Sequence, residues 1–471
     1  MNAPSQDPQQ HGGCPFSMAA PAADGEPPVR DGESSRDPVD NAESHRLSRR
    51  RLLKLGAVGS GLAAATAGSG LVQLPQAFAS PLSGQSGTDG PAFADGASEV
   101  TMQSAQQSSF EGEHQLGVLS EPTPYTSMVA FDVIAETRAE LRDLLQTLTT
   151  RMRLLYKGGL PQDDGPAAPA DDNGILGPSV PSRSVAFIFG VGASLFDERF
   201  GLISSKPATL ITMESFPNDN LDPALSQGDF SVQICANNAD TVVHALRDIT
   251  MHTRGAMQPR WQLDGFKSPP RPAGTPRNLM GFMDGIANPD TSEPSAMQQL
   301  VWVPQVGPES AWMAGGTFQV VRIIRMFVEF WDRAANYEQE NIIGRRKATG
   351  DPLDGTNEFS TPDYQSDPQG LITPLTAHIR LANPRTTASG PSRILRRGYN
   401  YARGLDVNGE LDQGLLFTCY QQNLLNQFIT VQGRLINEPL ADFISPIGGG
   451  YFFCPPGLGG DSSAYFGRGL V

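Results

Sequence analysis

The chain has 471 residues and a formal net charge of −15 at pH 7. A protein that binds nucleic acid needs a basic face, so this charge argues against a nucleic-acid partner. The length is too great for one simple core, which favours two domains or a duplicated domain, and the 39% of hydrophobic residues are enough for a substantial core.

The N-terminal segment carries the features of an export signal. Three arginines, Arg49–Arg51, precede an uncharged stretch rich in Ala and Gly, which ends at the small-x-small site Ala77–Ala79. This pattern predicts a disordered N-terminus and a Tat signal peptide over residues 1–79, cleaved before Ser80. A membrane anchor is the alternative, but the stretch is only weakly apolar. We expect export by the Tat machinery to the periplasm or the extracellular space, and a flexible lead-in over residues 80–113.

Regular patterns follow and predict an N-terminal domain over residues 114–265. Helical spacing of leucines, as at Leu141, Leu144 and Leu148, alternates with short apolar runs typical of strands. The predicted strands are 128–133, 185–190 and 230–235, and the predicted helices are 137–155 and 240–253.

The C-terminal half, residues 266–471, repeats this theme after a polar, proline-rich stretch around residues 259–276. Predicted strands are 300–303, 318–324 and 415–420, and predicted helices are 326–343 and 421–435. Strands interleaved with helices in both halves favour an α+β fold built by duplication.

The cysteines give no sign of a metal or redox site. The chain has no Cys-x-x-Cys pair, so a zinc site or redox dithiol is not expected. Cys235, Cys419 and Cys454 lie in apolar runs, which predicts buried free thiols.

One motif stands out in the second half. Gly281 and Gly285 bracket Asp284, and Asn288-Pro289 closes the segment with a turn signal. Glycines so close let the backbone pass near a bulky group and direct the carboxylate toward it. An ordinary surface turn is the alternative.

A candidate metal ligand lies downstream. The body of the chain has four histidines, His114, His244, His252 and His378, and no His-x-x-x-His or carboxylate cluster that would suit zinc or non-haem iron. A haem iron usually takes one imidazole on its proximal side. His378 lies in an apolar-flanked segment, where a structural histidine is the simpler interpretation of a lone His, so this residue by itself does not assign a haem site.

These segments together resemble the dye-decolourising peroxidase family. The resemblance rests on Gly281–Gly285, Ala377–Arg385 and Ile394–Gly398, with further matches at Gly344–Leu353 and Gly448–Phe453. It extends over roughly residues 115–458. It implies two ferredoxin-like α+β halves of the dimeric α+β barrel type, with one haem b per chain lodged in the C-terminal half.

The family's catalytic residues carry over onto matching positions. The resemblance implies that His378 is the axial ligand of the haem iron, that Asp284 is the distal acid–base residue and that Arg396 is the distal arginine. Arg397 is the alternative to Arg396 if the register differs by one. An ionised carboxylate can move a proton between the two oxygens of peroxide, and a guanidinium stabilises the negative charge that develops.

Other positions would contact the haem or its ligand. Leu415 and Phe417 would line the distal face, Gly285 would allow close backbone approach, and Arg380 would face a propionate. The acceptor for the other N–H of the proximal imidazole is expected to be Asp367 or Asp363.

The implied activity is oxidation of dyes, phenolics or similar one-electron donors by hydrogen peroxide through a ferryl intermediate. An exported haem-binding protein of iron acquisition is a second hypothesis, and a ferredoxin-like binding domain without haem is a third. The resemblance also allows a homo-oligomer and electron transfer through a surface Tyr or Trp.

Overall fold

The computed structural model describes residues 109–471, except 163–164, 308 and 310. The predicted Tat signal and most of the predicted lead-in lie outside the described residues. Within that part of the chain, no helix is both long and apolar enough to cross a bilayer.

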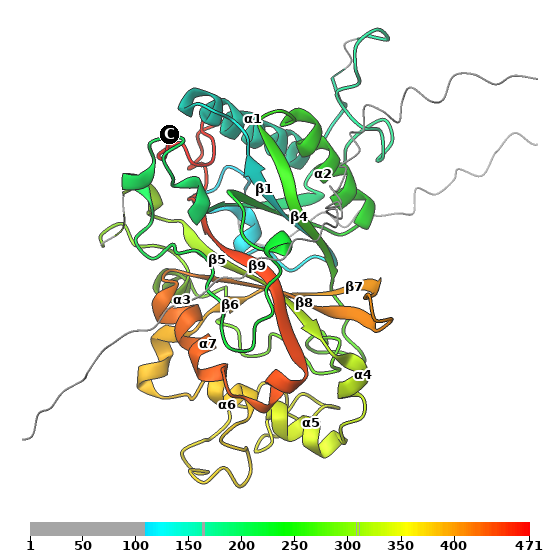
Figure 1. Ribbon diagram of the computed structural model, residues 1–471, viewed down its shortest axis with the longest axis vertical. Helices are drawn as coiled ribbons and strands as arrows, with labels where there is room; N and C mark the ends of the chain where they lie inside the picture. The colour runs from blue at the N-terminus through cyan, green and yellow to red at the C-terminus, as the bar shows by residue number, and fades with distance from the viewer. Residues whose placement is uncertain (1–108, 163–164, 308, 310) are drawn as a thin grey trace, which may run out of the picture. The chain divides into compact units, whose positions relative to one another are not determined.

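The N-terminal half is a four-stranded antiparallel sheet with two helices on one face (Figure 1). Its spatial order, β2-β3-β1-β4, is that of a ferredoxin-like βαββαβ unit. Helix α1 starts with a capping box between Thr137 and Glu140, and it buries the predicted leucine stripe. The elements are β1 (Tyr125–Val133), α1 (Arg138–Lys157), β2 (Val185–Gly192), β3 (Phe230–Ala236), α2 (Ala239–His252) and β4 (Met257–Phe266).

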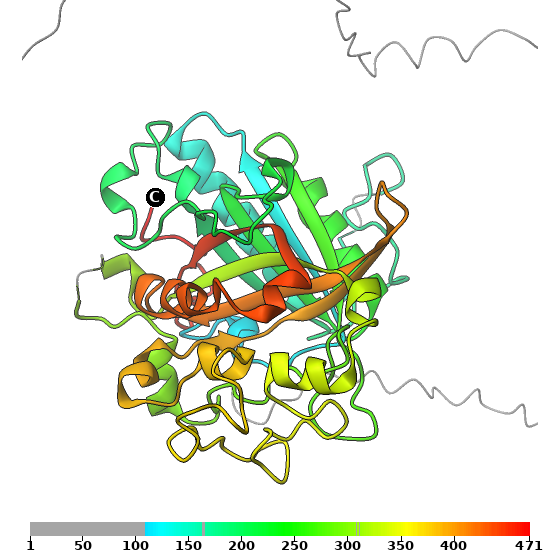
Figure 2. The same ribbon diagram turned by 60° about the horizontal axis from the view of Figure 1, so that its bottom comes forward.

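The C-terminal half repeats the arrangement, with strand order β9-β5-β8-β7 and a short extra strand, β6, beside β8. Its helices gather at the opposite end of the molecule from α1 and α2 (Figures 1 and 2). The elements are α3 (Pro294–Leu300), β5 (Thr317–Met326), α4 (Val328–Trp331), α5 (Asn336–Ile343), α6 (His378–Ala382), β6 (Leu395–Arg396), β7 (Tyr399–Leu405), β8 (Leu411–Gln421), α7 (Thr430–Leu435) and β9 (Ile444–Cys454). The predicted α+β fold with two ferredoxin-like halves is confirmed.

The two sheets join edge to edge and close into a barrel. Within the described residues, β4 meets β7 through one residue pair, Phe266 with Asn400. On the other side β2 meets β9 through two pairs, at Val191 and Gly192. Side chains of both halves, including Trp261, Tyr401 and Phe452, fill the interior.

Several predicted elements differ from the structure. The strand predicted over 300–303 is wrong: Leu300 is the last residue of α3, and the N–H groups of Val301 and Trp302 still donate to the Met297 carbonyl of that helix. The single helix expected over 326–343 is divided into α4 and α5 by a break after Trp331. The helix expected from residue 421 begins only after β8 has ended at Gln421, with a π-helical turn before α7. Strand β4 runs through Pro259, whose missing N–H is tolerated at a register shift in the pairing with β1.

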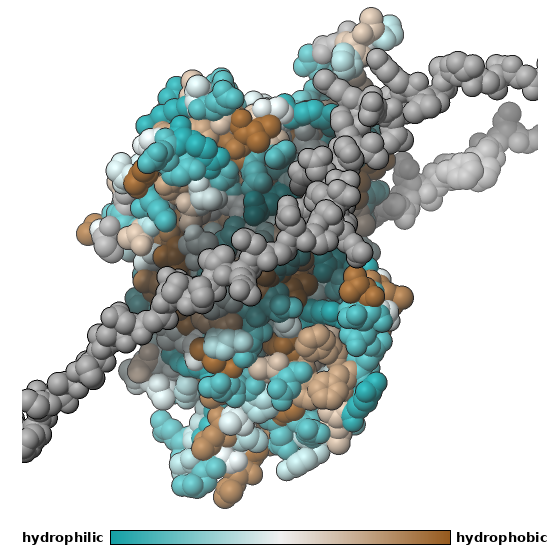
Figure 3. All heavy atoms as spheres, in the orientation of Figure 1, coloured by the Kyte–Doolittle hydropathy of each residue, from teal (hydrophilic) through white to brown (hydrophobic). Residues whose placement is uncertain are grey.

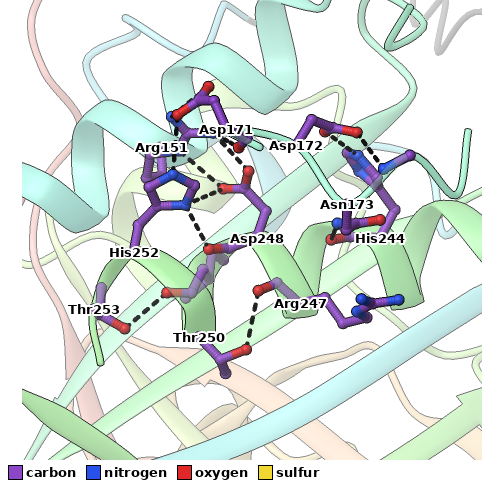
Figure 4. Close-up of polar contacts among 12 residues, drawn as sticks. Arg151, Asp171, Asp172, Asn173, His244, Arg247, Asp248, Thr250, His252 and Thr253 are labelled. Carbon is purple, nitrogen blue, oxygen red and sulfur yellow. Dashed lines mark hydrogen bonds and ion pairs between the residues drawn. The ribbon is translucent and has the colours of Figure 1, made fainter. Parts of the chain in front are cut away.

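The long connection between α1 and β2 is tied to both N-terminal helices by charged groups (Figure 4). Asp171 accepts from Arg151 at 3.2 Å and lies 3.1 Å from His252 Nε2, while Asp172 lies 2.6 Å from His244 Nε2. Burial acts to raise the pKa of Asp171, but the His252 hydrogen bond and the charge of Arg151 outweigh it and hold the pKa below its usual value. These histidines therefore have structural partners.

The visible face of the folded part is mainly hydrophilic, with apolar residues scattered over it (Figure 3). The three described cysteines, Cys235, Cys419 and Cys454, are free and buried, as predicted.

Candidate active site

A cavity lies between the outer face of the C-terminal sheet and helices α6 and α7. Strands β5 and β8 supply much of its floor, including Ile324, Leu415 and Phe417, and His378 and Leu435 come from the helices. Its walls are mostly apolar, which suits a flat hydrophobic group.

His378 is the first residue of α6, and its ring has one fixed partner. Its Nδ1 lies 2.6 Å from the carboxylate of Glu438, whose side chain is only 5% exposed. Burial acts to lower the pKa of His378, but the charge and hydrogen bond of Glu438 outweigh it and raise the pKa above its usual value. An Nδ1–H donated to Glu438 leaves Nε2 as the ring nitrogen that can bind a metal.

Glu438 replaces both predicted partners of the imidazole, so that prediction is wrong. The Asp367 carboxylate accepts from the backbone N–H groups of Leu371 and Thr373, and Asp363 accepts from the Ser366 hydroxyl on an exposed turn. Glu438 is 60 residues from His378 in the chain, and no spacing pattern in the sequence pointed to it.

Arg380 does not take the position expected for a residue that faces a haem propionate. Its guanidinium donates to the backbone carbonyls of Thr373 and Asp367 at 2.7 Å and lies 4.8 Å above the Tyr364 ring. Two residues along an α-helix turn the side chain by about 200°, so Arg380 points away from the group that His378 faces. It holds the loop before α6 instead.

Asp284 lies in a tight turn that depends on its glycines. Gly281 and Gly285 adopt φ values of +87° and +111°, which favour glycine. The Asp284 N–H donates to the Pro276 carbonyl at 2.9 Å, and Arg277 donates to the Gly281 carbonyl at 2.8 Å. The carboxylate, 20% exposed, forms an ion pair with Arg396.

The strand register separates the two neighbouring arginines. Arg396 lines the cavity, whereas Arg397 is buried and its charge acts on the thiol of Cys235. Arg397 directly follows β6 and continues its pairing with β8 through the Thr418 carbonyl. Consecutive residues of extended backbone point to opposite faces, so only one arginine of the pair can meet Asp284. The structure brings together Asp284, Arg396 and the β8 residues Leu415 and Phe417, with the Arg396 guanidinium 5.8 Å from the Phe417 ring centroid.

The residues present fit haem. Among the described residues, buried guanidinium atoms without a hydrogen-bond partner include Arg322 Nη1, Arg385 Nε and Arg396 Nε, and all three arginines line this cavity. One available imidazole nitrogen, apolar walls and donors without partners suit a metalloporphyrin that carries carboxylates. No group of three or more His, Cys, Asp or Glu side chains forms another metal site within the described residues.

A second, larger cavity adjoins the first, with ≈ 1090 Å³ against ≈ 260 Å³. We call it the vestibule; it is lined by several prolines of residues 122–124 and 269–276, by Lys267 and by the ends of β4 and β7. Asp284 and Arg396 line both spaces, so their ion pair lies in the partition between them.

Comparison with known proteins agrees with this geometry. The models of the Dyp-type peroxidase N-terminal and C-terminal domains match residues 115–267 and 275–459. The chain is 49% identical over 367 residues to the Deferrochelatase of Escherichia coli strain K12, an alignment that covers 77% of this chain and 86% of that protein.

Solved structures support the same assignment. Ferric DtpA from Streptomyces lividans is 35% identical with a TM-score of 0.70, covering 79% of this chain and 99% of that one. A DyP-type peroxidase from Cellulomonas bogoriensis is 33% identical with a TM-score of 0.68, covering 77% and 97%. The chain therefore belongs to the Dyp-type peroxidases and is a haem-dependent oxidoreductase.

Proposed function

We propose that His378 binds the haem iron and that Asp284 and Arg396 act on hydrogen peroxide in the same cavity. The observation that supports this most directly is the arrangement of one oriented imidazole and one carboxylate–guanidinium pair around a single apolar space. Haem, when bound, supplies the two electrons that cleave the O–O bond and recovers them singly from the reducing substrate.

The protein's own part is proton movement and charge stabilisation. The Asp284 carboxylate takes the proton from the inner oxygen of peroxide and returns it to the outer oxygen, so that water leaves. Arg396 is always charged, and it stabilises negative charge on the oxygens while the proton is in transit. Its Nε has no partner among the described residues, so a donor remains for the oxidant.

The route to the Asp284–Arg396 ion pair favours a small oxidant. The vestibule is the proposed route of peroxide, because Asp284 and Arg396 lie in its wall. Leu415 and Phe417 narrow the smaller cavity that His378 lines, which we call the inner cavity. Dyes, phenolics and similar donors are therefore oxidised at its edge or through a surface Tyr or Trp.

The test is stopped-flow absorbance of the haem-loaded protein mixed with hydrogen peroxide. Arg396→Leu should lower the second-order rate constant of the Soret change about 10²–10³-fold, as loss of a preorganised donor does elsewhere. Arg397→Lys, at the neighbouring position that faces the barrel, is the matched control and should keep the rate within a few fold. Equal rates in wild type and Arg396→Leu would remove Arg396 from the reaction.

Release of iron from haem is a second candidate function, favoured by the 49% identity to a protein named Deferrochelatase. Removal of iron requires two protons to replace it on the pyrrole nitrogens. Anaerobic incubation of the loaded protein with dithionite, without peroxide, would then yield free ferrous iron and fluorescent protoporphyrin in equal amounts. Haem that stays intact in this assay would exclude the activity under those conditions.

The proposed function also includes export from the cytoplasm and assembly into a homo-oligomer. We expect the Tat machinery to carry the folded chain to the periplasm or extracellular space, with cleavage after Ala79. Replacing Arg49 and Arg50 by lysine should retain the precursor inside the cell, and the mass of the exported protein gives the cleavage site. Light scattering of the purified protein would reveal a homo-oligomer.

A further inference from the structure

The backbone of Arg396 needs a partner that β8 does not provide. The N–H of Arg397 donates to the Thr418 carbonyl at 2.8 Å, and the Arg397 carbonyl accepts from the Thr418 hydroxyl at 2.7 Å. Backbone groups of successive strand residues point to opposite sides in the sheet plane. The N–H and C=O of Arg396 therefore point away from β8, and among the strands of the described residues none lies on that side of β6.

The side chain of Asn288 supplies both missing bonds. Its Nδ2 donates to the Arg396 carbonyl at 2.7 Å, and its Oδ1 accepts from the Arg396 N–H at 3.0 Å. A carboxamide carries the same donor and acceptor as a peptide group, so Asn288 acts as one residue of a missing neighbouring strand.

Asn288 belongs to the same short segment as Asp284. The Asn288 N–H donates to the Gly285 carbonyl at 3.2 Å, which turns the chain back toward β6. The segment thus holds Arg396 twice, through its backbone at Asn288 and through its guanidinium at Asp284. Two attachments fix both the position and the direction of the arginine.

We infer that Asn288 is a positioning residue, whose carboxamide sets the Arg396 guanidinium against Asp284 and the incoming peroxide. The inference rests on the function proposed for Arg396. With Asn288 removed, two backbone groups lose their partners and the short strand can shift. A displacement of about 1 Å at a reacting group can cost about 10²-fold in rate.

The chain offers a matched control in the N-terminal half. Gln115 makes the same reciprocal pair with the backbone of Phe189, at 2.7 and 2.9 Å, and it lines neither cavity. Gln115→Ala removes an equivalent clamp, so it reproduces a general loss of stability without touching Arg396.

The first experiment is stopped-flow kinetics on a double-mutant cycle of the haem-loaded protein. Asn288→Ala should lower the peroxide rate constant about 10–100-fold, Gln115→Ala should not, and Asn288→Ala should add little in an Arg396→Leu background. A full additional loss in that background would overturn the inference, since Asn288 would then act independently of Arg396. An unchanged rate in Arg396→Leu alone would instead refute the proposed function.

A second measurement needs no haem. Hydrogen exchange of a peptide spanning residues 394–399 should speed up at least ten-fold in Asn288→Ala, and it should stay at the wild-type rate in Gln115→Ala. Unchanged exchange in Asn288→Ala would show that the Asn288 carboxamide does not hold the backbone of Arg396. Should that variant fail to fold, Asn288→Asp keeps the acceptor for the Arg396 N–H, and a two- to ten-fold slower peroxide reaction is expected, whereas a wild-type rate would refute the inference.

Discussion

Glu438 should set the electron density of the imidazole, and Glu438→Gln tests this at constant size. The carboxylate is nearly buried and lies 2.6 Å from His378 Nδ1. Glutamine can still accept the hydrogen bond through its carbonyl oxygen, but it carries no charge. The substitution therefore removes the charge and keeps the contact.

The expected change in the ferric/ferrous reduction potential follows from the difference between a charged and a neutral hydrogen bond. A bond to a charged group contributes about 1.5–3 kcal/mol and a neutral one about 0.5–1.5 kcal/mol, so the loss is about 1–1.5 kcal/mol. A carboxylate stabilises the more positive ferric state more than the ferrous state. For one electron, a tenfold change is about 59 mV, so this loss, placed on the ferric state, should raise the ferric/ferrous potential by roughly 40–65 mV.

Spectroelectrochemical titration of the Soret band measures this potential. Asp367→Asn is the matched control, because Asp367 is a buried carboxylate near α6 that bonds to backbone groups and Arg380 rather than to His378. It should shift the potential by no more than about 15 mV on the same scale. Equal shifts in the two variants would show that general charge, and not the Glu438 bond, sets the potential.

Three further predictions follow from other parts of the chain. Phe417→Ala should widen the inner cavity. The ratio of the rate constants for cumene hydroperoxide and hydrogen peroxide should therefore rise about ten-fold in the stopped-flow assay. An unchanged ratio would show that Phe417 does not limit the size of the oxidant. Asp171→Asn should lower the free energy of unfolding in urea by about 1 kcal/mol at pH 7. Because the folded-state pKa of Asp171 is lowered, that difference should be present above the pKa of the unfolded chain, near 4, and should vanish as the pH falls through the lower folded value; a difference that persists in acid would contradict the ion-pair interpretation. Burial raises the pKa of Cys235, Cys419 and Cys454, so iodoacetamide should label these three thiols only after unfolding. Rapid labelling at any of these three positions in the native protein, located by mass spectrometry of its peptides, would disprove their burial.

The sequence predicted the elements whose pattern is locally strong. The apolar runs of β2, β3 and β5 and the leucine stripe of α1 are visible without knowledge of the fold. Strand β6 is only two residues long and includes a charged residue, so no periodicity marks it.

Among the site residues, too, those that belong to a local motif could be predicted and those that depend on long-range packing could not. Asp284 and its glycines form a local motif, so their backbone conformation could be expected. The choice between Arg396 and Arg397 depends on the phase of a strand, which sequence alone does not define. The contact of Glu438 with His378 depends on packing between segments 60 residues apart, and nothing in either segment specifies the other.

The join between the two halves forms part of the vestibule wall. Gly265, Phe266, Asn400 and Ala402 line it, and they lie where β4 and β7 meet through a single residue pair among the described residues. A full ladder there would seal the wall with backbone hydrogen bonds. The seam between the duplicated halves thus lies beside Asp284, and under the proposed function widening or bridging it is a way to change which oxidants reach the ion pair.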